Sequence, residues 1–180
     1  MDDASAPPRI VVMGPSGSGK SVVGEALAAR LTAEHPRLRF IDSDDLHPAA
    51  NVEKMRAGHP LDDSDRRPWL EALHAYVASE AAAGRSVVMT CSCLKRAYRE
   101  TLTAGLPAVF FVQLEVPRAV LEERLRNRVG HYMPASLLGS QLDTLEPLGP
   151  DEPGIIVRAD HPPAEVIETV LAKLEKSLRN

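Results

Sequence analysis

The sequence predicts an α/β fold of three layers, in which helices cover both faces of a five-stranded parallel sheet. Short apolar runs alternate along the chain with longer segments whose apolar residues recur at helical spacing. One of these runs leads directly into a glycine-rich turn at residues 14–19. Strands that are joined through helices become parallel, and the ligands of such sheets lie at the carboxyl ends of the strands. We therefore expect the functional site at that edge of the sheet.

The expected strands and helices follow one another along the whole chain. Five apolar runs are expected to be buried strands: 10–13, 38–41, 86–90, 108–114 and 154–157. Segments with apolar residues three and four apart are expected to be helices: 21–34, 68–83, 94–104, 118–128 and 164–178. Two polar segments, 47–67 and 128–153, interrupt this order. We expect them to be a substrate-binding insertion and a lid on a single domain that spans residues 1–180.

Length and charge limit the classes of function. The 180 residues suffice for one core, and the formal net charge of -4 gives no overall attraction to nucleic acid or anionic lipid. No apolar run approaches the roughly 20 residues of a membrane helix, so we expect no membrane and a cytoplasmic location. Residues 1–8 are expected to be a frayed leader. Cys91 and Cys93 are expected to be reduced packing residues at a strand end.

The glycine-rich turn matches the phosphate-binding pattern G-x-x-x-x-G-K-[ST] at every fixed position. Its residues are Gly14, Pro15, Ser16, Gly17, Ser18, Gly19, Lys20 and Ser21. Glycines let successive backbone N–H groups point into one concavity, which cradles phosphate oxygens at the positive end of the next helix. Lys20 is expected to reach the β- and γ-phosphates of ATP, and Ser21 to bind Mg²⁺. The alternative is a turn without a ligand, which the flanking strand and helix patterns disfavour.

Acidic residues follow the second expected strand. Alternate side chains of an extended segment point the same way, so Asp42 and Asp44 are expected to project together beside the phosphates. Asp42 is the candidate ligand of Mg²⁺, and Asp44 is the candidate that orients the attacking hydroxyl of an acceptor. The alternative is that these acids cap the turn that follows them. His47 is a weaker candidate, because a lone histidine in a loop often only bonds to backbone.

Several further segments of the chain resemble the gluconokinases of the small P-loop type. They are Asp42–Pro48, Asn51–Met55, Asp65–Leu70, Cys91–Arg99, Arg124–Met133 and Gln141–Pro147. The phosphate-binding loop occurs in many enzymes, whereas the D-x-D-x-x-H-P and D-R-x-P-W-L pieces together are specific. The resemblance implies a fold similar to shikimate and nucleoside monophosphate kinases. It also implies ATP-dependent phosphorylation of D-gluconate on its terminal hydroxyl, which gives 6-phosphogluconate, and a homodimer.

A substrate of this kind has a carboxylate at one end, so its site needs a cluster of cations. Arg66, Lys95 and Arg99 are the candidates for the carboxylate, although each could also form an ordinary ion pair on a helix face. Ser92, at an expected helix N-terminus, is a candidate donor to the substrate. The resemblance adds two histidines as candidate substrate contacts: His47 and His131.

Two arginines stand four residues apart where a helix runs into the expected lid. Arg124 and Arg128 are expected to place positive charge around the transferred phosphoryl group and to exclude water, and the resemblance favours this role most for Arg128. The alternative is a charged surface helix. In related folds the adenine base lies between the lid helix and the loop after the last strand, here residues 158–162. Trp69 is expected to be a core anchor.

Two other classes of function stay open at this stage. A shikimate or nucleoside monophosphate kinase would use the same phosphate-binding loop with a different acceptor. A regulatory protein that binds ATP as a switch needs no acceptor, and the Asp42 and Asp44 pair argues against it.

Overall fold

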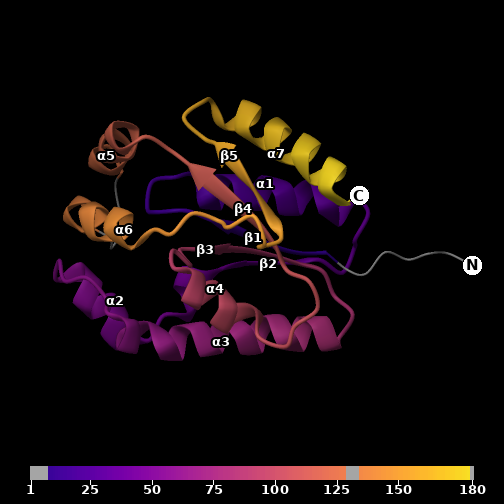
Figure 1. The fold of residues 1–180 in the computed structure, drawn as a ribbon, viewed down its shortest axis with the longest axis horizontal. Helices are drawn as coiled ribbons and strands as arrows, with labels where there is room; N and C mark the ends of the chain where they lie inside the picture. Colours follow the sequence, from indigo (N-terminus) through magenta and orange to yellow (C-terminus); the bar gives the residue numbers. More distant parts are fainter. Residues whose placement is uncertain (1–7, 129–133, 179–180) are drawn as a thin grey trace, which may run out of the picture.

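A computed structural model of the chain describes residues 8–128 and 134–178. Within this part of the chain the expected three-layer α/β/α fold is confirmed (Figure 1). His131 and residues 1–7 of the expected leader lie outside the described residues. Pro8 is described, and its carbonyl accepts a hydrogen bond of 2.9 Å from the Val87 N–H. The chain is therefore already paired with the sheet at Pro8, one residue before the first strand begins.

Five parallel strands form the sheet, in the order β2-β3-β1-β4-β5. They are β1 (Arg9–Met13), β2 (Arg39–Asp42), β3 (Val87–Cys91), β4 (Phe110–Glu115) and β5 (Gly154–Arg158). Every expected strand is present, with ends that differ by no more than two residues, but β2 and β5 are only partly buried, because they are the edges of the sheet. In the register, Met13 at the end of β1 lies between Cys91 of β3 and Gln113 of β4. The carboxyl ends of the central strands therefore lie level at one edge.

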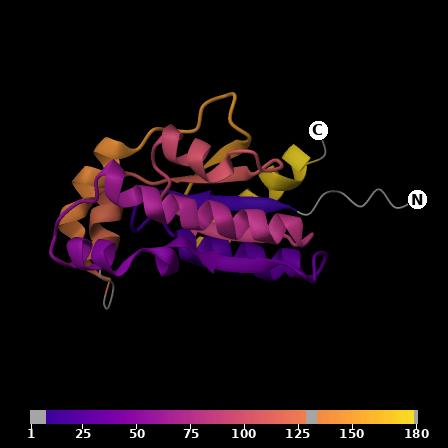
Figure 2. The ribbon, with the colours of Figure 1, turned by 90° about the horizontal axis from the view of Figure 1, so that it is seen from below.

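Two pairs of helices cover the two faces of the sheet (Figure 1). Helices α1 (Lys20–Thr32) and α7 (Pro163–Leu178) pack on one face, and α3 (Asp63–Ala82) and α4 (Arg96–Thr103) pack on the other. Figure 2, seen from below, shows α3 running along the sheet with α4 beside it. Alternate residues of β1 divide between the two cores, Ile10 with α1 and α7, and Val11 with α3 and α4.

The remaining helices gather at the carboxyl edge of the sheet (Figure 1). They are α2 (Ala49–Arg56), α5 (Arg118–Arg126) and α6 (Leu138–Thr144), with the 3-10 turns Ser43–Leu46 and Ala135–Leu137. The sequence patterns did not predict α2 and α6, which are short and belong to the two polar insertions. Met55 and Leu61 of the first insertion pack on Leu137 of the second, so the insertions share a small core. No described helix is long and apolar enough to cross a bilayer.

Helix α3 begins five residues before Pro68, the expected start. Asp62 accepts a hydrogen bond from the Asp65 N–H at 2.8 Å, and Asp65 accepts one from the Asp62 N–H at 2.9 Å. This reciprocal capping is strong enough to start the helix upstream of the proline. It places Arg66 and Trp69 on one buried side of α3. Trp69 is fully buried, as expected for a core anchor, and both cysteines are free and buried.

Candidate functional site

The turn from β1 into α1 forms the wall of a first cavity. Gly17 and Gly19 have φ angles of 83° and 93°, in the left-handed region that favours glycine. A Cβ on Gly17 would also lie 3.2 Å from Leu125 Cγ, so α5 approaches this turn closely. No side chain caps the start of α1 at Gly19, which leaves the first N–H groups of the helix directed at the cavity. This geometry suits the oxygens of a phosphate chain.

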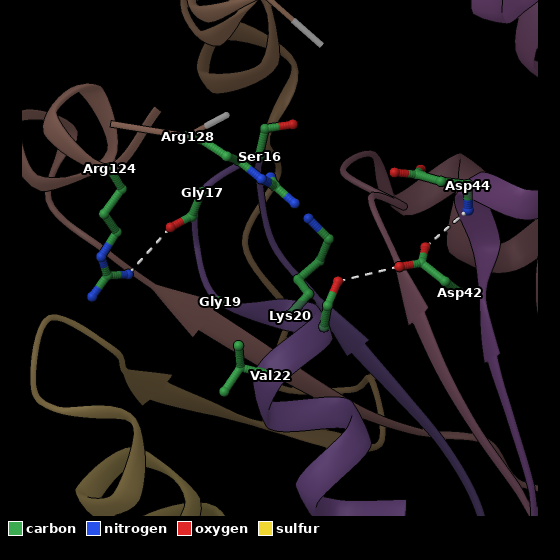
Figure 3. A pocket seen from close by; sticks show the side chains of 10 residues that line it. Ser16, Gly17, Gly19, Lys20, Val22, Asp42, Asp44, Arg124 and Arg128 are labelled. Carbon is green, nitrogen blue, oxygen red and sulfur yellow. Dashed lines mark hydrogen bonds between the residues drawn. The ribbon is translucent and has the colours of Figure 1, made fainter. Parts of the chain in front are cut away.

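The first cavity brings together the charged residues that the sequence nominated for the phosphates, Mg²⁺ and the attacking hydroxyl (Figure 3). Its lining consists of Ser16, Gly17, Gly19, Lys20, Ser21, Val22, Asp42, Asp44, Arg124 and Arg128. The Lys20 ammonium donates a hydrogen bond of 3.1 Å to the Pro15 carbonyl, which holds it over the loop. Burial lowers the pKa of Lys20, while the carboxylates of Asp44 and Asp42 act in the opposite direction. Phosphate oxygens would add the negative charge that favours a protonated Lys20.

Ser21 and Asp42 meet at the edge of the first cavity. The Ser21 hydroxyl donates to an Asp42 carboxylate oxygen at 3.2 Å (Figure 3). The described residues contain no cluster of three His, Cys, Asp or Glu side chains that could hold a metal ion. A hydroxyl and one carboxylate suit Mg²⁺, which takes most of its ligands from water and from substrate phosphates. The donor set at this point therefore fits the expected ion.

The backbone after β2 differs from the extended segment that the sequence suggested. Residues Ser43–Leu46 form a 3-10 turn, and the second Asp42 oxygen caps it by accepting from the Asp44 N–H at 3.0 Å. The alternation argument was therefore wrong for this segment, and the capping alternative is correct for Asp42. Both carboxylates still line the first cavity, because the turn folds Asp44 back toward Lys20.

Arg124 and Arg128 occupy different positions at the same cavity. Arg124 donates to the Gly17 carbonyl at 3.2 Å and to the Ala159 carbonyl at 2.9 Å, so it ties the phosphate-binding loop to the loop after β5. Arg128 lies two residues beyond the end of α5, with an exposed side chain. Its positive charge lowers the pKa of Lys20, which indicates that both cations face one space (Figure 3).

A second cavity lies beside the first, at the position where the adenine base is expected from related folds. It is lined by Gly17, Ser18, Gly19, Val22, Val23, Arg124, Ala159, His161, Pro163 and Val166. Val22 borders both cavities and keeps 51% of its surface exposed, although most valines are buried. An apolar wall of this kind beside a phosphate site suits the flat face of a nucleobase.

A third cavity lies between the two insertions. It is lined by His47, Met55, Pro60, Leu61, Arg66, Ser92, Leu137, Ser140 and Gln141. Arg66 is only 8% exposed, and its buried Nε has no hydrogen-bond partner among the described residues. The guanidinium carbon lies 5.5 Å from the centre of the Tyr98 ring. A buried cation at a cavity wall is a suitable partner for a carboxylate.

Comparison with known proteins assigns the chain to a family. Residues 10–148 match a family model described as an AAA domain. The chain is 47% identical over 162 residues to a gluconokinase of Gluconobacter oxydans (strain 621H), which covers 90% of this chain and 88% of that protein. It is 42% identical over 159 residues to the thermosensitive gluconokinase of Escherichia coli (strain K12), with 88% and 82% covered. The chain belongs to the gluconokinase family.

Solved structures agree with this assignment. A gluconokinase from Sinorhizobium meliloti 1021 superposes with a TM-score of 0.85 at 44% identity, over 97% of this chain and 95% of that one. An APS kinase from Mycobacterium tuberculosis has a TM-score of 0.66 at 21% identity, over 94% of this chain and 98% of that one. The second match shows only that the fold is common to both proteins.

In this gluconokinase-family chain, Arg99 does not reach any of the three cavities. Its side chain is 1% exposed and forms two hydrogen bonds to the Glu152 carboxylate, at 2.6 and 2.8 Å. It also donates to the carbonyls of Cys93, Leu94 and Glu146. The expectation of a substrate contact is therefore corrected: Arg99 joins α4 to the segment that leads into β5.

Lys95 and Ser92 also differ from their expected settings. Lys95 pairs with Asp63 at 2.9 Å and lines a separate, open surface hollow with Tyr98. Lys95 does not line the third cavity. Ser92 does line the third cavity, but it is not the helix cap, because α4 begins after Lys95.

Gln141 is a site residue that the sequence patterns did not single out for a role. Its Oε1 accepts a hydrogen bond of 2.7 Å from the Ser16 N–H, and its Nε2 donates to the Ser16 hydroxyl at 3.3 Å. The residue lies on α6, is buried, and also lines the third cavity. The Gln141 side chain therefore lies between the phosphate-binding loop and the third cavity and contacts both. Ser16 and Gln141 are 125 residues apart in the sequence, so no local sequence pattern predicts this contact.

Replacing Arg99 by Met is expected to destabilise the protein by about 3 kcal/mol, because Glu152, whose side chain is only 10% exposed, would lose its charged partner. The bond to Arg99 lowers the pKa of Glu152, so the pair stabilises the fold above the ordinary glutamate value of 4.5 and loses this effect as the pH falls through the lowered pKa. Urea unfolding at neutral and acid pH measures both effects. The exposed Arg96 provides the control Arg96→Met, with a much smaller loss. A raised KM for the acceptor in folded Arg99→Met would restore Arg99 to the site.

Replacing Gln141 by Leu is expected to raise the KM for ATP and to destabilise the fold by about 1–3 kcal/mol, because the buried Ser16 N–H would lose its acceptor. The matched control is Gln113→Leu, since Gln113 is also buried and accepts from the Leu148 N–H at 2.8 Å. Urea unfolding and ATP titration of both variants separate the two effects. An equal change in ATP affinity for both would show that Gln141 has no particular role at the loop.

Proposed function

We propose that this chain transfers the γ-phosphoryl group of ATP to the terminal hydroxyl of D-gluconate, which yields 6-phosphogluconate and ADP. The observation that carries the proposal is the common wall of the first and third cavities. Gln141 lines the third cavity and bonds to Ser16, which lines the first. The buried Arg66 supplies positive charge at the third cavity. A sugar acid that reaches from the third cavity to the first would place its carboxylate near Arg66 and its terminal hydroxyl near the phosphates.

The first cavity supplies the groups that phosphoryl transfer requires. The reaction forms a bond between the substrate hydroxyl oxygen and the γ-phosphorus, and breaks the bond to the oxygen that stays on ADP. Lys20 and the N–H groups of the loop hold the phosphates, and Arg128 adds charge at the open side. Asp44 orients the hydroxyl and accepts its proton. These groups act mainly by alignment and charge, because the reaction needs little covalent help from a protein.

Ser21 and Asp42 are the residues that would hold Mg²⁺. The ion, when bound, neutralises charge that develops on the β- and γ-phosphates. The Ser21 hydroxyl is already directed at the Asp42 carboxylate, so the two oxygens lie within 3.2 Å of each other. Asp42 is further fixed by its cap on the 3-10 turn. The second cavity, with Val22 on one side and Arg124 at its edge, is proposed to bind the adenine base.

Substrate recognition is assigned to the third cavity. Arg66 is proposed to bind the carboxylate of D-gluconate, with Ser92 and His47 as further contacts. Residues 47–67 then form the substrate-binding insertion and residues 128–153 the lid of one kinase domain. A contact from His131, a homodimer and a cytoplasmic location stay predictions from the sequence.

The test is ADP release from the purified protein with MgATP and one acceptor at a time. D-gluconate is expected to stimulate release and to yield 6-phosphogluconate. Shikimate, the common nucleoside monophosphates and epimers of gluconate are expected to give little turnover. Turnover of one of these in place of D-gluconate would overturn the substrate assignment and leave the phosphate chemistry in place.

Replacing Asp44 by Asn is expected to lower kcat by about 10²–10⁴-fold, because the amide cannot accept the hydroxyl proton. The KM for ATP should change little. Asp45 provides the matched control: it is the exposed neighbour in the same turn and does not line the first cavity. Steady-state kinetics of Asp44→Asn and Asp45→Asn make the comparison. Equal kcat values for the two variants would remove Asp44 from the mechanism.

A further inference from the structure

The imidazole of His47 lies at the third cavity with its orientation set by its neighbours. His47 follows the 3-10 turn that carries Asp44. Its ring stacks on the Trp69 indole, with 4.4 Å between ring centres and an angle of 9° between planes. Trp69 is itself fully buried, and its Nε1 donates to the Ser43 carbonyl at 2.8 Å. The imidazole therefore lies flat on a side chain that burial and a hydrogen bond hold in place.

One edge of the ring is occupied by Asn51. The Asn51 Nδ2 donates to the Asp65 carbonyl at 2.8 Å, and because a carbonyl oxygen only accepts, this bond fixes which end of the amide faces that way. The same Nδ2 lies 3.4 Å from His47 Nδ1. Asp65 is held in turn by Lys54, at 2.6 Å, and by the capping of α3. The amide group is thus a hydrogen-bond donor in a fixed position.

This arrangement decides which ring nitrogen carries the proton. Two N–H donors do not bind each other, so His47 Nδ1 must present its lone pair to Asn51. In a neutral imidazole the proton then resides on Nε2. Burial, and after it the positive charge of Arg66, lower the pKa of His47 to about 4. The neutral ring is therefore the form present at neutral pH.

The other edge of the ring is available to a ligand. His47 Nε2 forms no hydrogen bond to any residue within 8–128 and 134–178, and the residue lines the third cavity. The neighbours that face His47 are Asn51 from α2 and Trp69 and Arg66 from α3. The Arg66 and Trp69 side chains carry no acceptor, and the Asn51 amide meets the ring at Nδ1 and not at Nε2. The cavity therefore presents one N–H donor beside the Arg66 guanidinium.

We propose that His47 binds the acceptor substrate as a neutral, fixed hydrogen-bond donor, through Nε2–H to a hydroxyl or carboxylate oxygen. The assignment rests on the proposed function, because it places the acceptor in the third cavity. It also excludes His47 as the base of the reaction, since the only lone pair of the ring faces Asn51. An acceptor without an oxygen at this point displaces water from the Nε2–H and leaves it unpaired, which selects for oxygen-rich substrates.

Three substitutions at His47 separate this role from a structural one. The Gln side chain places an amide nitrogen near the position of Nε2, whereas the Asn side chain places one near Nδ1. His47→Gln is expected to keep the KM for D-gluconate within about threefold of wild type, and His47→Asn to raise it by about tenfold or more. His47→Phe keeps a flat ring on Trp69 and should behave like His47→Asn. The KM for ATP should change little in all three.

His74 provides the matched control, because its Nδ1 also has a single partner, the Leu102 carbonyl at 3.0 Å, and it lines none of the three cavities. His74→Gln and His74→Asn should leave the KM for D-gluconate unchanged. A larger KM for His47→Gln than for His47→Asn would overturn the proposal, since it would show that the Asn51 contact is the one that matters. Equal KM values for wild type, His47→Gln and His47→Asn would also overturn it. If His47→Phe does not fold, the contrast between Gln and Asn decides.

The acceptor screen on the wild type keeps this proposal separate from the proposed function. If wild type phosphorylates an acceptor other than D-gluconate, the proposed function fails, and the same variants are compared with that acceptor. The KM values of His47→Gln and His47→Asn for that acceptor then support or overturn the role of His47, whichever acceptor the enzyme uses. A wild type that phosphorylates no acceptor overturns both.

Discussion

Three contacts from distant parts of the chain hold the turn between β1 and α1, and the whole site depends on them. Gln141 of α6 binds the Ser16 N–H, and Arg124 of α5 binds the Gly17 carbonyl. Asp42 of β2 binds the Ser21 hydroxyl at the start of α1. Left-handed glycines have little conformational preference of their own. The shape of the phosphate-binding loop is therefore imposed by tertiary contacts, and its N–H groups converge before any ligand arrives.

The parts of the fold that the sequence predicts well are those with a local signal. The buried central strands β1, β3 and β4 are short apolar runs whose ends are marked by polar or turn residues, so their positions follow from the sequence. The loop after β1 has a fixed sequence pattern of glycines and a lysine, so its presence and its ligand class follow from the sequence. The meeting of Ser21 and Asp42 could also be foreseen, because Asp42 ends one strand and Ser21 follows another, and both strands end at one edge of a parallel sheet.

Two basic residues at helical spacing can lie in different environments, and the sequence alone does not predict which environment each one has. Lys95 and Arg99 lie one helical turn apart, yet one is paired at the surface and the other is buried against Glu152. The difference comes from partners 32 and 53 residues away in the sequence. The start of α3 was missed for another reason: Pro68 is a familiar start signal, but the mutual capping of Asp62 and Asp65 overrides it. Local patterns name candidates, and only long-range contacts select among them.

The exposed Val22 affects how nucleotide binding should respond to temperature. Its side chain borders both the phosphate-binding cavity and the apolar cavity beside it. A nucleotide that fills both cavities removes this methyl surface from water, together with the apolar walls formed by Ala159 and Val166. Removal of apolar surface from water lowers the heat capacity of the system. Association with a nucleotide therefore becomes more exothermic as the temperature rises, although the contacts to the phosphates are polar.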